Sequence, residues 1–259
     1  MGNLLRYNLR KLSREKSFYI TLGINLALIM LSVLVMVVRN QMYTSDLERE
    51  YVESVLRPML HGTNFFLSSP AQNMFLMLTG IFVAITVCSD FSQRTIRNMY
   101  ARGYSRLSCY VAKVLTVVIA LTVAYAVSML VSFAATQLFI GDIDGDFGKI
   151  AAVIGLQYLT VLASGMFILM LSMLMRKTGG AVASAVLAPN VISLVLLLIN
   201  EIPALEEVVL AEYWLDTFLQ NLSTDAVSAE RMLWILGLSL GYIAVFFLIG
   251  LLPIRKVEV

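Results

Sequence analysis

Residues 110–140, YVAKVLTVVIALTVAYAVSMLVSFAATQLFI, decide the fold class of this chain. The stretch holds one charged residue, Lys113, close to its start, and its apolar residues do not alternate with polar ones. A membrane-spanning helix needs about 20 apolar residues, whereas a barrel strand needs only about 10 that alternate. Because hydrocarbon offers no partner for backbone N–H and C=O groups, a run of this length is expected to cross a membrane as an α-helix.

Six such apolar stretches occur, and none has an ionisable residue near its middle. They cover residues 17–38, 73–89, 110–140, 150–175, 181–199 and 232–252. The chain is 59% hydrophobic and 14% charged, with a mean hydropathy of +0.83. Soluble domains are about 45–50% apolar and about 25% charged, so a water-soluble fold, a disordered chain and a nucleic-acid module are excluded. The sequence predicts an all-α integral membrane protein with a single transmembrane domain over residues 1–259.

The charges between these stretches predict the orientation. Fourteen of the 19 Lys and Arg residues lie in segments 1–16, 90–113, 176–180 and 253–259. Fourteen of the 17 Asp and Glu residues lie in the three alternate segments, 39–72, 141–149 and 200–231. Basic loops stay on the cytoplasmic side, so we expect a multi-pass protein of the cell (plasma) membrane with both termini in the cytoplasm.

Signs of catalysis or metal binding are missing from the sequence. It has no GxxxxGK[ST] phosphate loop, HExxH or GxSxG motif, and Cys88 and Cys109 form no CxxC pair. His61, the only histidine, is expected to be an ordinary residue of an external loop. No cofactor is therefore expected in this chain. The absence of acidic or basic side chains expected at membrane depth argues against an ion-driven transporter, so any energy for transport is expected to come from elsewhere.

Segment 1–16 has the pattern of an amphipathic helix. Leu4, Leu5, Leu9 and Leu12 share one side of a helical wheel, and Arg6, Arg10 and Arg14 recur every fourth residue on another. Such a helix would lie in the membrane interface with its leucines toward the acyl chains. Alternatively, the charges only orient the first span.

Segment 90–109 predicts a helix, a glycine turn and a second helix. Ser92 is expected to cap the first helix, Gly103 to end it, and Ser105 to cap the helix that continues into the third span. The apolar side chains expected on one side of the first helix are Ile96, Met99 and Tyr100. A soluble partner could push on this surface; a solvated connecting loop is the alternative.

Four groups of residues in this region carry a family resemblance. They are Asp90-Phe91, Arg94-Thr95-Ile96-Arg97-Asn98, Gly103-Tyr104-Ser105-Arg106 and Lys113. They resemble the acidic-aromatic, x-T-I-R-N, G-x-S-R and following Lys pattern in the permease subunits of type-2 ABC exporters. The layout of a basic N-terminal helix, six spans and a long outer loop before the sixth span is also similar to that family.

The resemblance implies a partner and a docking surface. The partner would be a separate ABC ATPase subunit that holds ATP and Mg, with a second permease half, the same or a related chain, completing the transporter in the lipid membrane. The residues implied to dock on the ATPase are Asp90, Phe91, Arg94, Thr95, Ile96, Arg97, Gly103, Ser105 and Arg106. No nucleic-acid partner is expected.

Polar side chains within the spans are candidates for a substrate path. They are Asn25, Thr122, Tyr125, Ser132, Thr136, Gln157 and Asn190. Such groups either line a cavity or form hydrogen bonds between helices. Because fixed charges are scarce, the expected substrate is amphipathic or hydrophobic: an antimicrobial peptide, a drug or a lipid-like molecule. A non-transporting sensor or scaffold subunit and an integral-membrane enzyme are the alternative functions.

The loop at residues 200–231 is expected to form a short amphipathic or re-entrant helix at the outer leaflet. Its apolar residues recur at helical spacing and include the pair Tyr213-Trp214. The acidic residues Glu206, Glu207, Glu212 and Asp216 either face a basic substrate or are solvated external charges. In the sixth span, Gly237-xxx-Gly241 has the spacing that permits close helix approach.

Overall fold

The structure, a computed structural model, describes residues 2–42, 62–68, 73–92, 95–141, 143, 145–201, 210–223 and 227–255. Within these ranges all regular secondary structure is helical, and six helices are long and apolar enough to cross a membrane. The six are α2 (Lys16–Met42), α6 (Asn73–Ser92), α8 (Arg106–Phe139), α9 (Phe147–Met175), α10 (Thr178–Asn200) and α12 (Ala229–Arg255). The predicted all-α membrane fold with six spans is confirmed.

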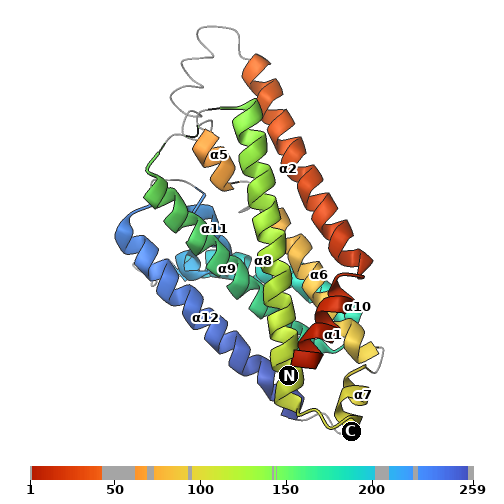
Figure 1. Cartoon of the computed structure of the whole chain (residues 1–259). Helices are drawn as coiled ribbons and strands as arrows, with labels where there is room; N and C mark the ends of the chain where they lie inside the picture. The colour runs from red at the N-terminus through yellow and green to blue at the C-terminus, as the bar shows by residue number, and fades with distance from the viewer. Residues whose placement is uncertain are drawn as a thin grey trace.

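Five shorter elements connect or flank these helices in the described ranges. They are α1 (Gly2–Leu12), α5 (Gly62–Ser68), α7 (Thr95–Ala101), the 3₁₀ helix η2 (Leu210–Tyr213) and α11 (Leu215–Asn221). Figure 1 shows α1, α7 and the Arg255 end of α12 gathered at one end of the bundle, with α5 and α11 toward the other. We call the first the basic end and the second the acidic end.

Local capping sets the ends of the long helices. Asp146 starts α9 by accepting a hydrogen bond from the N–H of Gly148 at 2.9 Å. Arg176 ends α9 in the left-handed conformation, φ 55°, and its guanidinium donates to the carbonyl of Pro253 at 2.8 Å. The short α9–α10 connection is thereby fixed to the end of α12.

The prediction for Ser92 is wrong. Ser92 lies in the last turn of α6 rather than at the start of α7, and its hydroxyl donates to the carbonyl of Ser89 at 3.0 Å. A serine hydroxyl can bond to a carbonyl three or four residues back, and here that bond keeps Ser92 inside the helix. As a result α6 extends beyond the predicted stretch at 73–89 and carries Asp90 in its last turns.

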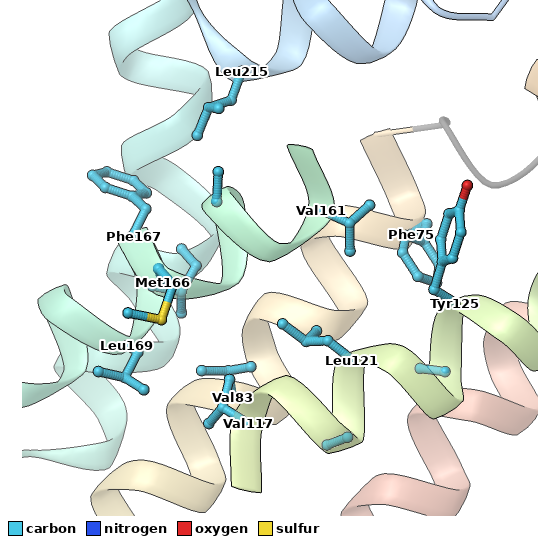
Figure 2. Packing of buried hydrophobic residues seen from close by; sticks show 14 of the residues in the cluster. Phe75, Val83, Val117, Leu121, Tyr125, Val161, Met166, Phe167, Leu169 and Leu215 are labelled. Carbon is cyan, nitrogen blue, oxygen red and sulfur yellow. The ribbon is translucent and has the colours of Figure 1, made fainter. Parts of the chain in front are cut away.

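The core is centred on α9, which buries 14 of its 29 residues. Figure 2 shows side chains of α6, α8 and α9 meeting there, among them Val83, Leu121 and Met166. By contrast α10 buries very few residues, and α2, α10 and α12 expose large apolar side chains, such as Leu34, Leu194 and Leu248 respectively. An exposed apolar surface of this extent suits a lipid environment.

Helix α12 packs closely on α8 at the basic end through a glycine. The Tyr110 ring is 1% exposed, and its hydroxyl donates to the carbonyl of Phe247 at 2.9 Å. A Cβ at Gly250 would overlap this hydroxyl. The two glycines of the predicted packing motif, Gly237 and Gly241, instead have no atom within 4 Å of where a Cβ would be.

Gly250→Ala is therefore expected to lower stability by about 1–3 kcal/mol, because the rigid Tyr110 ring must move and its hydroxyl loses its acceptor. The measurement is thermal unfolding of the purified chain in detergent. Gly237→Ala on the same helix is the matched control, and we expect no loss there because its site is open. Equal effects of the two substitutions would contradict this account of helix packing.

Candidate functional site

The segment between α6 and α8 forms a compact helix and turn. After α7, the N–H of Gly103 donates to the carbonyl of Tyr100 at 2.9 Å, and Gly103 adopts φ +81°, a conformation that favours glycine. Ser105 then caps α8 by accepting from the N–H of Ser108 at 3.2 Å. The predictions that Gly103 ends the first helix and that Ser105 caps the second are thus confirmed.

The residues proposed for docking lie around this turn at different depths. Asp90 is buried and Phe91 packs against the core, whereas Ser105 is exposed. Thr95, Ile96 and Arg97 lie in α7, and the side chains of the latter two are outside the described residues, as is Arg94. The guanidinium of Arg106 lies over the Tyr100 ring at 5.9 Å, so α8 and α7 are in contact.

A buried ion cluster joins three helices just behind α7. Asp90 of α6, 2% exposed, forms ion pairs with Lys11 of α1 at 2.5 Å and with Lys113 of α8. Lys11 also donates to the hydroxyl of Ser89 at 2.8 Å, and Lys113 donates to the carbonyl of Thr86 at 3.2 Å. One carboxylate therefore holds the N-terminal helix and the two helices that flank α7.

A second carboxylate balances the cluster. Glu15 follows α1 and accepts a hydrogen bond from the Thr86 hydroxyl at 3.0 Å. The two ammonium groups of Lys11 and Lys113 are thus accompanied by two carboxylates within one small region. Partnered charges of this kind are tolerated in a buried site because each retains close hydrogen-bonding groups.

These contacts overturn two expectations. Asp90 and Lys113 are buried, at 2% and 5% exposure, so the chain does bury charged side chains, although near the ends of spans and not at their middles. The leucine side of α1 also faces the protein: Leu4 and Leu12 are 3% and 8% exposed, and α1 packs on α8 (Figure 1). The cluster draws α1 onto the bundle, whereas Arg6, Arg10 and Arg14 remain exposed.

Sequence reasoning assigned no role to Lys11 or Glu15. The sequence did carry a signal for Lys11. It follows Leu4 by seven residues, close to two helical turns, so both side chains lie on the same side of α1. An ammonium group beside a buried leucine face needs a carboxylate as its counter-ion. Outside segment 1–16, which holds Glu15, Asp90 at the end of the second span is the first acidic residue in the basic segments.

Gln157 makes a second polar junction toward the acidic end. It is fully buried on α9, and its amide donates to the carbonyls of Leu67 in α5 and Leu222 after α11, at 2.9 and 2.8 Å. Its own carbonyl accepts from the Tyr125 hydroxyl at 3.1 Å. One side chain therefore fixes both short helices of the acidic end on α8 and α9.

The remaining candidate path residues on α2 and α8 form hydrogen bonds inside the chain, with one exception. Asn25 donates to the Ser128 hydroxyl at 2.7 Å, and Ser132 donates to the carbonyl of Phe66 at 3.4 Å. The hydroxyl of Thr122 lies 2.7 Å from that of Tyr158. Thr136 is buried, and its hydroxyl has no partner in the described part of the chain. The bonds of Asn25, Ser132 and Thr122 match the interhelical alternative.

Asn190 borders a cavity of about 40 Å³, larger than the one of about 10 Å³ beside Asn25. It lies after Pro189 within α10 and donates to the carbonyl of Val186 at 2.6 Å. Asp216 of the predicted outer helix, now seen as α11, borders the same cavity. Of the other acidic residues in that loop, Glu212 is half-exposed and pairs with Arg231 at 3.0 Å, while Glu206, Glu207 and also His61 lie outside the described residues.

The fold and these sites define a polytopic helical membrane protein whose helices are joined by a buried ion cluster at one end and a buried amide at the other. The chain belongs to the family described as protein of unknown function (DUF2705), which matches residues 26–259. A comparison with curated proteins gives no match.

Asp90→Asn is expected to destabilise the protein by about 3–5 kcal/mol, because Lys11 and Lys113 would lose their shared counter-charge. Thermal unfolding in detergent measures the effect. Glu212→Gln is the matched control, since its partner Arg231 is 43% exposed and surface pairs contribute about 0–1 kcal/mol. A D90N protein as stable as E212Q would show that the cluster does not hold these helices together.

Proposed function

We propose that this chain is the membrane-spanning permease subunit of an ATP-driven ABC exporter. It works with a separate ATPase subunit that binds ATP and Mg, and with a second permease half, and it catalyses no reaction of its own. The observation that carries the proposal is the position of α7, a short helix ended by Gly103 between α6 and α8 and backed by the buried cluster around Asp90.

The connections of α7 suit the transmission of force. A soluble subunit that moves α7 moves the ends of α6 and α8 with it, because Asp90 and Lys113 join those two helices. The third member, Lys11, brings α1 into the same unit. Since breaking one partner of a buried ion pair costs several kcal/mol, these helix ends are expected to move together.

The basic end is proposed to face the cytoplasm. Arg6 and Arg10 of α1 and Arg14 just after it are exposed there, and Arg176 and Lys177 form the nearby α9–α10 connection. Such clustering of basic residues is typical of cytoplasmic loops. An ATPase subunit would then meet α7 on the side where ATP is present.

The proposed substrate is amphipathic or hydrophobic, such as an antimicrobial peptide, a drug or a lipid-like molecule. The exposed faces of α2, α10 and α12 are apolar, and the charged residues Asp90 and Lys113 pair with each other at the basic end. A molecule moving along these surfaces would meet few unpaired charges in the described residues.

Orientation is tested by single-cysteine labelling in intact cells, in a background with Cys88 and Cys109 replaced by alanine. Gln220→Cys at the acidic end is expected to react with a membrane-impermeant maleimide added outside. Ser13→Cys, equally exposed at the basic end, is expected to react only after permeabilisation. The reverse pattern would place α7 outside and reject the proposal.

Coupling is tested by Gly103→Val combined with Arg97→Glu. Valine is strained at φ +81°, and the reversed charge changes the proposed docking surface. We expect normal insertion but at least tenfold less co-purified ABC ATPase and substrate-stimulated ATP hydrolysis. Gly179→Val, at an open site in the first turn of α10, is the matched control. If the wild-type chain retains no ABC ATPase, or the double variant transports fully, the proposal fails.

A further inference from the structure

The cavity bordered by Asn190 lies where α6, α9 and α10 meet beneath α11. Its volume of about 40 Å³ exceeds the roughly 10–15 Å³ that one water needs by this measure, so it has room for a small polar group. Apolar side chains form much of its wall, including Leu76, Phe167, Ile168 and Trp214. Its polar lining determines which group fits.

Asp216 brings a carboxylate into this cavity. Ser193 of α10 donates to one of its oxygens at 3.1 Å. Ser193 is seven residues from the end of α10 at Asn200, which corresponds to about 10 Å along the helix. Burial raises the pKa of Asp216, and the side chains of Ser193 and Trp214 beside the carboxylate act in the opposite direction. Asp216 belongs to none of the ion pairs between described residues.

The other polar groups of the cavity have unused acceptor capacity. Thr79 and Ser164 donate their hydroxyl protons to carbonyls of their own helices, so their oxygens remain free to accept. Asn190 uses its N–H₂ group on Val186 and keeps its side-chain oxygen.

Pro189 adds a backbone acceptor. Proline has no N–H, so it cannot bond to the carbonyl of Ala185 one turn earlier in α10. That carbonyl oxygen lies 3.7 Å from where a Cβ of Gly80 in α6 would be. Both residues line the cavity. An acidic group, several oxygens and apolar walls are complementary to a cation that carries N–H donors and an apolar chain.

We propose that this cavity binds the ammonium group of an alkylammonium compound, with Asp216 as counter-ion and the Asn190 and Ala185 oxygens as further acceptors. Cation binding at this site does not require a transport partner. As a subsite for a transported molecule it rests on the proposed function, and it narrows the substrate class to cationic amphipaths.

Two other cations fit less well. A divalent metal ion requires several carboxylates, and the described residues contain no group of three or more His, Cys, Asp or Glu that could hold one. A bare sodium ion would leave the apolar walls unused.

The test is a fluorescence titration of the full chain in lipid nanodiscs, without any ATPase. Trp234→Phe removes the second tryptophan, which is 62% exposed on α12, and leaves Trp214 in the cavity wall as the reporter. The probe is hexylammonium chloride, compared with hexanol and sodium chloride. We expect a saturable change with hexylammonium only, and at least tenfold weaker binding for Asp216→Asn.

Two further variants keep the test decisive. Glu212→Gln changes a nearby solvated acid, and its affinity for hexylammonium is expected to stay within twofold of the parent's. This result would distinguish binding in the cavity from attraction to acidic residues on the surface. Gly80→Ala adds a methyl group at ordinary contact distance inside the cavity and is expected to weaken binding at least threefold even if Asp216→Asn does not fold.

Equal binding by D216N and its parent, saturable binding of hexanol, or competition by sodium at equal concentration would overturn the site. Because the titration contains no ATPase, those results leave the export proposal standing. Failure of the ATPase to associate would conversely reject export and leave the cation site intact.

Discussion

The buried carboxylate of Asp90 is the interaction on which the arrangement of the basic end depends. It lies between the ammonium groups of Lys11 and Lys113, which come from opposite sides of α6 in the sequence. Without it, two lysines would share an apolar region with no direct counter-charge, and α1 would lose its polar attachment to the bundle. The leucine side of α1 and the turn at Gly103 are oriented relative to the rest of the chain by this one contact set.

The sequence predicts the long helices well because membrane solvation acts over a whole stretch. Each of the six spans appears where the apolar windows place it, with ends displaced by a few residues. Gly103 and Ser105 were also predictable, since positive φ and N-capping are properties of single residues and their near neighbours. These features need no knowledge of which helices touch.

Long-range partners were not predictable in the same way. Asp90 and Lys113 are far apart in sequence, and only the reversal of the chain through α7 brings them together. Likewise Gln157 bonds to backbone carbonyls at Leu67 and Leu222, which carry no side-chain signal at all. The prediction that the α1 leucines face the acyl chains was wrong for a related reason. An amphipathic pattern specifies an apolar face but not whether lipid or protein covers it.

Helix α6 connects the ion cluster to the cavity wall. It carries Asp90 in the ion cluster and Gly80 in the cavity wall, ten residues apart, or about 15 Å along one helix. It also packs against both α9 and α10, of which α9 is deeply buried and α10 is not. Because α10 is held on fewer sides than α9, a tilt of α6 would displace α10 more readily than α9. The least costly response is a change between α6 and α10 near Pro189, where the helix already lacks one hydrogen bond. That is the wall of the cavity, so force applied at the ion cluster would alter the size of the site bordered by Asp216.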